Sequence, residues 1–448
     1  MNFRYLPMTE EDRREMLDVL GLDSVDQLFQ DIPENIRFKG RLDIPEPMPE
    51  PVLTRHMKRL AGSNASFDRY TSFLGAGTYE HYIPSVVNHV ISRSEFYTAY
   101  TPYQPEISQG ELQAIFEFQS MICELTGMEV ANSSMYDGAT ALAEAAGVAS
   151  AATRKRKILV SRAVHPEARA ILTTQAKGLG LEVVEITCKD GVTDLEELES
   201  AGDAATAAVI IQSPNFFGNV EDLARVEQIA HARRGLLIVS TNPVALGLLK
   251  PPGEYGADIV VGDAQPMGIP AQFGGPHCGF FAVTRKLMRK VPGRIVGQTR
   301  DEDGVRGFVL TLQAREQHIR REKATSNICS NQALNALAAA VWMTALGKQG
   351  LRELARLNLN KAHYARKRLS QVPGVTPLFD RPFFNEFALR LDRPVPEVNQ
   401  RLLQGNIIGG YDLARDYPEW ENAMLVAVTD MRTKEEIDGL ARILEGWA

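Results

Sequence analysis

Short signatures of several common enzyme classes are absent from the 448-residue sequence. It contains no GxxxxGK(S/T) phosphate loop, no HExxH zinc motif and no GxSxG nucleophile elbow. A single GxG, at Gly75–Gly77, does not lie between a predicted strand and a predicted helix, so it does not indicate dinucleotide binding. The eight histidines are too widely spaced to predict a metal site. Walker-type nucleotide binding, zinc peptidase chemistry and serine hydrolase chemistry therefore have no support.

Cysteines and long apolar runs are also scarce. The four cysteines form no CxxC pair, which is typical of reduced thiols packed as small hydrophobic side chains; they are Cys123, Cys188, Cys278 and Cys329. No stretch approaches the roughly 18 consecutive apolar residues of a membrane helix. The first residues, MNFRYLPMTEEDRREM, have no apolar run behind their charges, as a signal peptide has. We therefore expect a cytoplasmic protein.

The charge balance excludes one further class. The net charge of −7 argues against a nucleic-acid-binding protein, because neutralising phosphates requires a basic surface. A composition of 44% hydrophobic and 23% charged residues is ordinary for a soluble globular protein. A chain of 448 residues is too long for one compact core, so we expect two or three packed units.

Apolar runs rich in β-branched residues alternate with helical patterns through the middle of the chain. Helical patterns fill most of the gaps between the runs, for example at 166–178 and 221–233. Such alternation predicts an α/β fold with a mostly parallel sheet that is covered on both faces. The predicted strands are 157–161, 182–187, 207–212, 236–240, 258–262 and 279–283.

Both ends of the chain have a different pattern. The first sixty residues resemble a helical arm, and the proline-rich stretch IPEPMPEP (44–51) predicts an extended connector. From Ser330 an alanine-rich helical region reaches about Ser370, and strands at 385–391 and 423–430 bracket a helix near 396–404. We predict three regions: a helical arm and linker (1–62), a large α/β domain (63–330) and a C-terminal α+β domain (331–448).

Four helix starts carry the pattern of a capping box, in which a hydroxyl residue precedes an acidic or amide residue by three positions. The pairs are Thr9 with Asp12, Ser24 with Gln27, Ser108 with Glu111, and Thr433 with Glu436. The third pair is predicted to open a strong helix that reaches about Thr126.

Long stretches of the sequence resemble one known family. The residues SFLGAGTYEHYIPSVV…YTAYTPYQPEISQGELQAIFEFQSMICELTGMEVANSSMYDGATALAEA (72–145) are similar to the first half of the glycine cleavage system P-protein. Three more stretches match the same family in order: PPGEYGADIVVGDAQPMGIPAQFGGPHCGFFAV (251–283), REKATSNICSNQAL (321–334) and RPFFNEFALRL (381–391). The similarity covers essentially the whole chain.

The resemblance implies a fold and a function. The family is similar to fold-type I pyridoxal-phosphate enzymes, with a seven-stranded large domain and a C-terminal α/β domain. Its P-protein occurs as one chain of two related halves or as two subunits, and 448 residues resemble subunit 1 alone. The implied partners are glycine decarboxylase subunit 2, in an α2β2 assembly, and the H-protein. The complex would decarboxylate glycine on pyridoxal phosphate and pass the aminomethyl group to the H-protein lipoamide.

The sequence departs from the catalytic half of the family where that half holds the cofactor. The family implies a Schiff-base lysine after the strand ADIVVGDA, but no lysine occurs between Lys250 and Lys286, and Gln265 stands at that position. An amide cannot form an imine. After the preceding strand an aspartate is implied for the pyridine nitrogen, and the sequence has Ser240, Thr241 and Asn242. We therefore expect no catalytic residue on this chain alone, with pyridoxal phosphate held by the partner.

Two groups are interpreted as vestiges of a cofactor site. Asn132, Ser133 and Ser134 match the place where the catalytic half binds the phosphate at a helix N-terminus. The alternative is that they simply cap a helix at 138–147. His165 matches a histidine that stacks on the cofactor ring, and the alternative is a packing residue.

Three further groups are interpreted as facing the partner. Thr325, Ser326 and Asn327 fit the role of contacts to the partner's cofactor phosphate, or else cap the following helix. A basic run lines a route for an anionic cofactor or substrate, or is a solvated helix face; it comprises Arg315, His318, Arg320, Arg321 and Lys323. A proline-punctuated loop carries substrate or interface residues, or packs the interface only; they are Tyr100, Tyr103, Gln104 and Glu106.

Three functional hypotheses follow. The leading one is a decarboxylase subunit that is catalytic only in its complex. A second is a purely structural assembly partner without ligand contacts, and a third is a self-contained pyridoxal-phosphate enzyme that uses another lysine. Alanine substitutions at Thr325 or Ser326 distinguish the first two hypotheses, and adding cofactor to the isolated chain tests the third.

Overall fold

A computed structural model describes residues 5–324, 326, 328 and 331–446. The chain divides into two compact units, Met1–Ala65 and Ser66–Ala448. The predicted division of the second unit into a large α/β domain and a C-terminal domain at residue 330 stays a prediction. Among the described residues no helix is long and apolar enough to cross a membrane.

The first unit contains helices α1 (Glu10–Leu20) and α2 (Glu50–Ala61) with a short 3₁₀ helix, Val25–Phe29, between them. Thr9 and Asp12 form the predicted capping box of α1. The predicted connector is wrong at its end, because α2 already begins at Glu50. Proline is tolerated in the first turn of a helix, where its missing N–H has no intrahelical acceptor, so Pro51 does not prevent this start.

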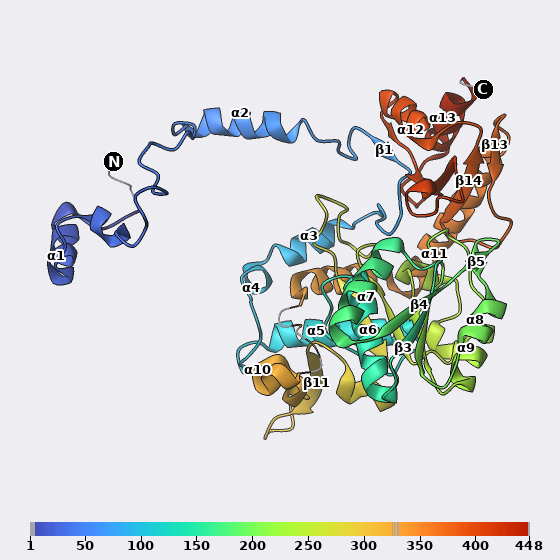
Figure 1. The fold of residues 1–448 in the computed structure, drawn as a ribbon, viewed down its shortest axis with the longest axis horizontal. Helices are drawn as coiled ribbons and strands as arrows, with labels where there is room; N and C mark the ends of the chain where they lie inside the picture. The colour runs from blue at the N-terminus through green and yellow to red at the C-terminus, as the bar shows by residue number, and fades with distance from the viewer. Residues whose placement is uncertain (1–4, 325, 327, 329–330, 447–448) are drawn as a thin grey trace. The chain divides into compact units, whose positions relative to one another are not determined.

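A seven-stranded sheet organises the second unit, in the order β2-β10-β9-β8-β7-β3-β4. Its strands β3 and β4 are labelled in Figure 1. The five strands from β9 to β4 are parallel, and β10 is antiparallel to both of its neighbours. The mostly parallel sheet predicted from the sequence is thereby confirmed. The strands are β2 (Val130–Ala131), β3 (Lys157–Ser161), β4 (Glu182–Ile186), β7 (Thr206–Gln212), β8 (Leu236–Ser240), β9 (Ile259–Asp263) and β10 (Gly279–Val283).

Alternate side chains of these strands enter two different cores. Leu159 of β3 belongs to the core on one face of the sheet, whereas Ile158 and Val160 belong to the core on the other. Helices α5 (Gln109–Thr126), α9 (Leu223–Ala232) and the first part of α11 (Ala333–Leu369) contribute to the first core. Helices α6 (Gly138–Thr153) and α7 (Pro166–Leu179) contribute to the second, so both faces are covered.

A second sheet lies in the C-terminal part, in the order β13-β14-β17-β16 and antiparallel throughout. Its strands β13 and β14 are labelled in Figure 1. Its strands are β13 (Val375–Pro377), β14 (Glu386–Leu391), β16 (Tyr411–Asp412) and β17 (Ala423–Ala427). Helices α12 (Val395–Gln404) and α13 (Lys434–Glu445) pack on it with the end of α11. The long helix α11 therefore contributes to both parts, and Gly347 interrupts it with non-helical torsion angles.

The remaining described strands and α-helices are short. They are β1 (Thr71–Ser72) with β15 (Ile407–Ile408), β5 (Cys188–Lys189) with β6 (Val192–Thr193), the hairpin β11 (Ile295–Arg300) with β12 (Arg306–Thr311), and helices α3 (Ser85–Ile91), α4 (Ser94–Tyr97), α8 (Leu195–Ala201) and α10 (Gln317–Arg320). One predicted cap is wrong: Ser108 precedes α5, but its side chain makes no capping hydrogen bond. The capping box of Thr433 and Glu436 at α13 is confirmed.

Candidate functional site

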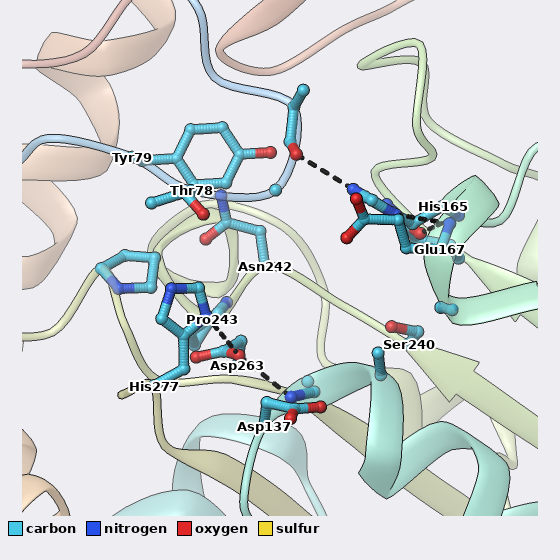
Figure 2. Close-up of a pocket in the computed structure, with 18 of the residues that line it drawn as sticks. Thr78, Tyr79, Asp137, His165, Glu167, Ser240, Asn242, Pro243, Asp263 and His277 are labelled. Atoms are coloured by element: carbon cyan, nitrogen blue, oxygen red, sulfur yellow. Dashed lines mark hydrogen bonds and ion pairs between the residues drawn. The ribbon is translucent and has the colours of Figure 1, made fainter. Parts of the chain in front are cut away.

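A cavity of about 490 Å³ opens at the carboxyl ends of the parallel strands. Ser240 ends β8 and Asp263 ends β9, and both line it, together with His165 after β3 (Figure 2). The loop 76–79 and the N-terminus of α6 complete the wall. In open α/β sheets the crevice beyond the strand carboxyl ends is the usual ligand site. This cavity is therefore the candidate site.

Two carboxylates occupy the N-terminus of α6. Asp137 is the N-cap and accepts a hydrogen bond from the Thr140 N–H at 2.7 Å. Asp263 accepts one from the Gly138 N–H at 3.0 Å. Backbone N–H groups at a helix N-terminus are the usual cradle for a phosphate. In this chain the protein's own carboxylates already use two of them.

Gln265 is 1% exposed and turned into the protein. Its side-chain oxygen accepts a hydrogen bond from the Tyr79 N–H at 2.9 Å. Its nitrogen donates to the carbonyl oxygens of Tyr79 and Ile269, each at 2.9 Å. The residue at the position of the implied Schiff-base lysine thus fixes the loop 76–79 and offers no group to a ligand.

A buried glutamate holds the same loop from the C-terminal sheet. Glu386 of β14 accepts hydrogen bonds from the Ala76 N–H at 2.7 Å and the Tyr79 hydroxyl at 2.5 Å. Burial raises the pKa of Glu386 to about 7, although these hydrogen bonds act in the opposite direction. Burial, followed by the charge of Glu386, also raises the pKa of Tyr79 well above its ordinary value.

Two histidines line the cavity in different surroundings. His165 Nε2 lies 3.0 Å from the Ala76 carbonyl oxygen, and His165 Nδ1 accepts from the Glu167 N–H at 3.2 Å. Burial lowers the pKa of His165, and a ring whose Nδ1 accepts a hydrogen bond is in its neutral form. His277 Nδ1 lies 3.1 Å from Asp263 Oδ2, and that contact raises its pKa. His165 therefore caps α7 and supports the loop 76–79, and its edge packs against a phenylalanine ring.

The three residues of the predicted phosphate site are fully buried. The Asn132 side chain donates to the Pro292 carbonyl oxygen at 3.0 Å. The hydroxyl oxygens of Ser133 and Ser134 accept from the Asn331 side chain at 2.8 Å and from the Gln332 N–H at 3.0 Å. The alternative, that they cap the following helix, is wrong because Asp137 is its cap, and that helix extends to Thr153.

Of the three predicted site residues in the KATSN segment (residues 323–327), the structure describes Ser326. Thr325 and Asn327 lie outside the described residues. Ser326 accepts a hydrogen bond from the Ile328 N–H at 3.1 Å, and its side chain also forms a hydrogen bond with Glu144. Burial raises the pKa of Glu144. The alternative role of the segment as a helix cap is wrong for Ser326, because α11 begins after Gln332.

The predicted interface loop and the predicted basic run lie on the protein surface, except for Arg315. Tyr103 is 61% exposed and Tyr100 75%, and both lie in the predicted non-helical loop, as do Gln104 and Glu106. Of the basic run, His318, Arg320, Arg321 and Lys323 are exposed. Arg315 is buried, so the alternative of one solvated helix face is wrong, and α10 itself spans four residues only.

Pyridoxal phosphate does not fit the residues of this cavity. Its ionisable lining side chains are Asp137, Glu167, Asp263 and the two histidines, and in the described chain no lysine or arginine lines it. A dianionic phosphate would meet carboxylates at the α6 N-terminus, and an aldehyde would find no amine at Gln265. Ser240, and not a carboxylate, stands at the end of β8. The described side chains supply none of the three usual attachments.

Several residues of the site were not predicted. Asp137 and Asp263 were not predicted, because only the tertiary fold brings the end of β9 to the N-terminus of α6. Glu386 had a usable signal, because a charged residue inside the apolar strand pattern NEFALRL needs a buried partner. Its partner Tyr79 lies 307 residues earlier in the chain, and nothing in the sequence pattern indicates that pairing.

Known proteins resemble the whole chain. The family model of the glycine cleavage system P-protein matches residues 3–444. The probable glycine dehydrogenases (decarboxylating) subunit 1 of Bacillus cereus (strain B4264) and Bacillus anthracis (strain A0248) are each 68% identical over 440 residues, which covers 98% of both chains. A crystal structure of glycine decarboxylase (P-protein), in inhibitor-bound form, is 45% identical with a TM-score of 0.91 and complete coverage of both chains.

More distant structures share the fold alone. A sphingosine-1-phosphate lyase of Burkholderia pseudomallei K96243 is 13% identical, with a TM-score of 0.67 and coverage of 92% of this chain and 94% of that chain. A NifS-like protein is 14% identical, with a TM-score of 0.63 and coverage of 84% and 99%. The predicted fold-type I architecture is thereby confirmed.

Proposed function

The chain belongs to the glycine cleavage system P-protein family, and we propose that it is subunit 1 of a glycine dehydrogenase (decarboxylating), an oxidoreductase that is complete only with a second subunit. With that subunit it takes part in decarboxylating glycine and in passing the aminomethyl group to the lipoamide of H-protein. The partner holds the pyridoxal phosphate. We further propose an α2β2 assembly in the cytoplasm.

The state of Gln265 is the observation that carries this assignment. The residue stands where the family implies an amine, and all of its hydrogen bonds are made within the protein. Asp137 and Asp263 add a second obstacle, because they occupy N–H groups that a phosphate requires. A member of this family with such a cavity acts through the site of another chain.

We propose that this chain contributes surface residues to the partner's site. The family resemblance implies that Thr325, Ser326 and Asn327 contact the partner's cofactor. The exposed loop that carries Tyr100 and Tyr103, with Gln104 and Glu106, borders the interface. His318 and Arg320 belong to the same border. Aromatic residues with polar ends are favoured at such interfaces, because they bury a large area and keep a hydrogen bond.

Co-expression with a P-protein subunit 2 tests the proposal. We expect the purified complex, with H-protein, to exchange labelled bicarbonate into glycine, and each subunit alone to be inactive. The isolated chain, given pyridoxal phosphate and borohydride, should retain no bound cofactor. Activity of the isolated chain, or a cofactor reductively trapped on it, would contradict the proposal. If alanine at both Ser326 and Thr325 left activity unchanged, the contribution of KATSN to the partner's site would be wrong.

A further inference from the structure

A short basic segment, Gln313–Lys323, stands out from an acidic chain. It carries four lysine and arginine residues and two carboxylates, whereas the chain as a whole has a net charge of −7. The segment consists of two 3₁₀ turns, Gln313–Arg315 and Arg321–Lys323, on either side of α10. It leads directly into the KATSN residues.

One arginine of the basic segment is buried without enough acceptors. Arg315 is 8% exposed, and one guanidinium nitrogen, Nη1, donates to the Val291 carbonyl oxygen. Its Nε and Nη2 are buried and have no hydrogen-bond partner among the described residues. Burial lowers the pKa of Arg315, which reflects the cost of this environment for the charge. Buried charges are normally paired, so Arg315 lacks part of its surroundings.

The neighbouring glutamate does not supply that acceptor. Glu316 Oε2 lies 3.8 Å from Arg294 Nε and 3.7 Å from His318 Nδ1, which are loose contacts. Glu316 Oε1 is buried and, within the described part of the chain, has no hydrogen bond. Both members of the sequence pair Arg315–Glu316 therefore have unused hydrogen-bonding groups inside the protein.

The exposed cations of the basic segment are also uncompensated. Arg320, Arg321 and Lys323 make no ion pair with any described residue, and Ile319 beside them is 52% exposed. The backbone of Arg321 has φ 52° and ψ −123°, which an L-residue adopts only under constraint. A segment with unused buried donors, unpaired charges and a strained residue is typical of an element that another chain completes.

We infer that the exposed cations of the basic segment dock against a carboxylate-rich surface of the second subunit. The inference rests on the proposed two-subunit function and adds the chemistry of the contact. Guanidinium groups recognise carboxylates through paired hydrogen bonds, and Arg320 and Arg321 present two exposed guanidinium groups.

A protein surface fits the basic segment better than a small anion. None of its residues lines the described cavity. Its exposed cations extend from Arg320 to Lys323 beside the apolar Ile319, a combination suited to a broad contact. The segment is also continuous with Ser326, which we place at the partner interface.

Assembly of the full-length chain with P-protein subunit 2 tests the inference. The dissociation constant would be measured by analytical ultracentrifugation at roughly 50, 150 and 300 mM NaCl, a range over which the screening length shortens markedly. For the double variant Arg320→Glu with Arg321→Glu we expect a complex at least about tenfold weaker at the lowest salt, with a flatter salt dependence, because rim charges control electrostatic association. The matched control, Lys348→Glu with Arg352→Glu on exposed α11 positions, makes the same charge change and should stay within about twofold.

Four outcomes would decide the matter. Wild-type affinity that does not fall with salt would overturn the inference without requiring any variant to fold. Equal weakening of the test and control pairs would also overturn it, since the effect would then be one of net charge. If the wild-type complex is active and the Arg320→Glu with Arg321→Glu variant binds the second subunit with the same dissociation constant, the proposed function stands and the docking role is wrong. Failure of the wild-type subunits to associate would overturn both.

Discussion

The side chain of Gln265 illustrates how one residue type determines what the cavity accepts. Its oxygen and both of its amide N–H groups are used by backbone groups of Tyr79 and Ile269. A lysine has no acceptor, so it leaves the Tyr79 N–H without a partner, and it brings a charge to a position that is 1% exposed. A lysine at position 265 therefore does not by itself create a cofactor-binding site.

We predict that Gln265→Lys destabilises the protein without producing a cofactor-binding chain. The loss of the acceptor for the Tyr79 N–H and the burial of a charged amine should lower the free energy of unfolding by about 3 kcal/mol. Urea unfolding measures the loss, and absorbance after adding pyridoxal phosphate tests for an imine. Gln371→Lys, at an exposed position, is the control and should cost less than about 0.5 kcal/mol. A borohydride-trapped adduct on the introduced lysine would show that the cavity retains more of a cofactor site than its carboxylates suggest.

Glu386 should make stability depend on pH. Its pKa is raised from 4.5 to about 7 in the folded protein, so the folded state keeps a proton that the unfolded state releases between these values. The free energy of unfolding therefore falls as pH rises from about 4.5 to 7 and levels off above that range. Glu386→Gln removes this dependence and keeps an acceptor for the Ala76 N–H. Relative to wild type, the variant should gain up to about 3 kcal/mol between about pH 4.5 and 8.

Chemical denaturation at a series of pH values measures the effect, and only the difference between the two proteins is diagnostic. Burial also raises the pKa of Glu221 to about 7, but that group is present in both proteins and cancels. A constant difference across the pH range would mean that Glu386 is ionised throughout.

The capping-box pattern forms its hydrogen bonds at one helix start, that of α13, and does not form them at another, that of α5. Thr433 and Glu436 make both hydrogen bonds of a capping box at α13. Ser108 and Glu111 have the same spacing but make neither, because the Ser108 backbone has φ −113° and ψ 21° and not the extended conformation of an N-cap. Glu111 is half-buried, and burial raises its pKa. The pattern predicts where a helix begins, but tertiary packing decides whether its cap forms.

We predict that alanine substitution distinguishes these two helix starts. Thr433→Ala should cost about 1 kcal/mol of unfolding free energy, because the Glu436 N–H loses its acceptor and the capping box is broken. Ser108→Ala, the matched control, should cost less than about 0.5 kcal/mol. Both values are measurable by urea titration. Equal costs would indicate that Ser108 caps α5 in solution.

Most elements were predictable from the sequence, and the candidate site was not. The strands at 157–161, 236–240 and 279–283 have the predicted bounds, because continuous β-branched runs indicate buried strands. The position of Gln265 followed from the family pattern, but its buried contacts depend on how the loop 76–79 folds over β9. The Tyr79–Glu386 bond joins residues far apart in the chain, and periodicity carries no information about such pairs.

The loop that bears Tyr79 also requires a glycine. Gly75 has φ 54°, and an added Cβ would lie 2.2 Å from the Ala427 Cβ and 2.5 Å from a Glu386 oxygen. Gly75→Ala should therefore cost about 3 kcal/mol or more. Gly304 has φ 78° with nothing within 4 Å of its Cβ position, so Gly304→Ala should cost about 1 kcal/mol, from backbone strain alone. Thermal unfolding of both variants checks the difference, and a smaller loss at Gly75 would mean that the two sheets separate easily at this loop.

At the scale of the whole molecule, contacts join the two sheets at several levels. The helix α11 places Trp342 in the core of the large sheet and Leu369 in the core of the C-terminal sheet. The strand pair β1–β15 and the bond from Tyr79 to Glu386 connect the same parts. Protein side chains and backbone therefore bridge the two parts directly, without the help of a ligand. We infer that residues 66–448 unfold as one cooperative unit.

Removing the first 65 residues should leave the stability of the second unit nearly unchanged. None of the described residues 5–65 is buried, and every hydrophobic core of the described chain is built from residues after Ser66. A stability change follows the apolar area that a segment buries, so the melting temperature of the 66–448 variant should lie within about 2 °C of the full chain. Calorimetry measures this shift. A fall of more than about 5 °C would mean that the stability of residues 66–448 depends on residues 1–65.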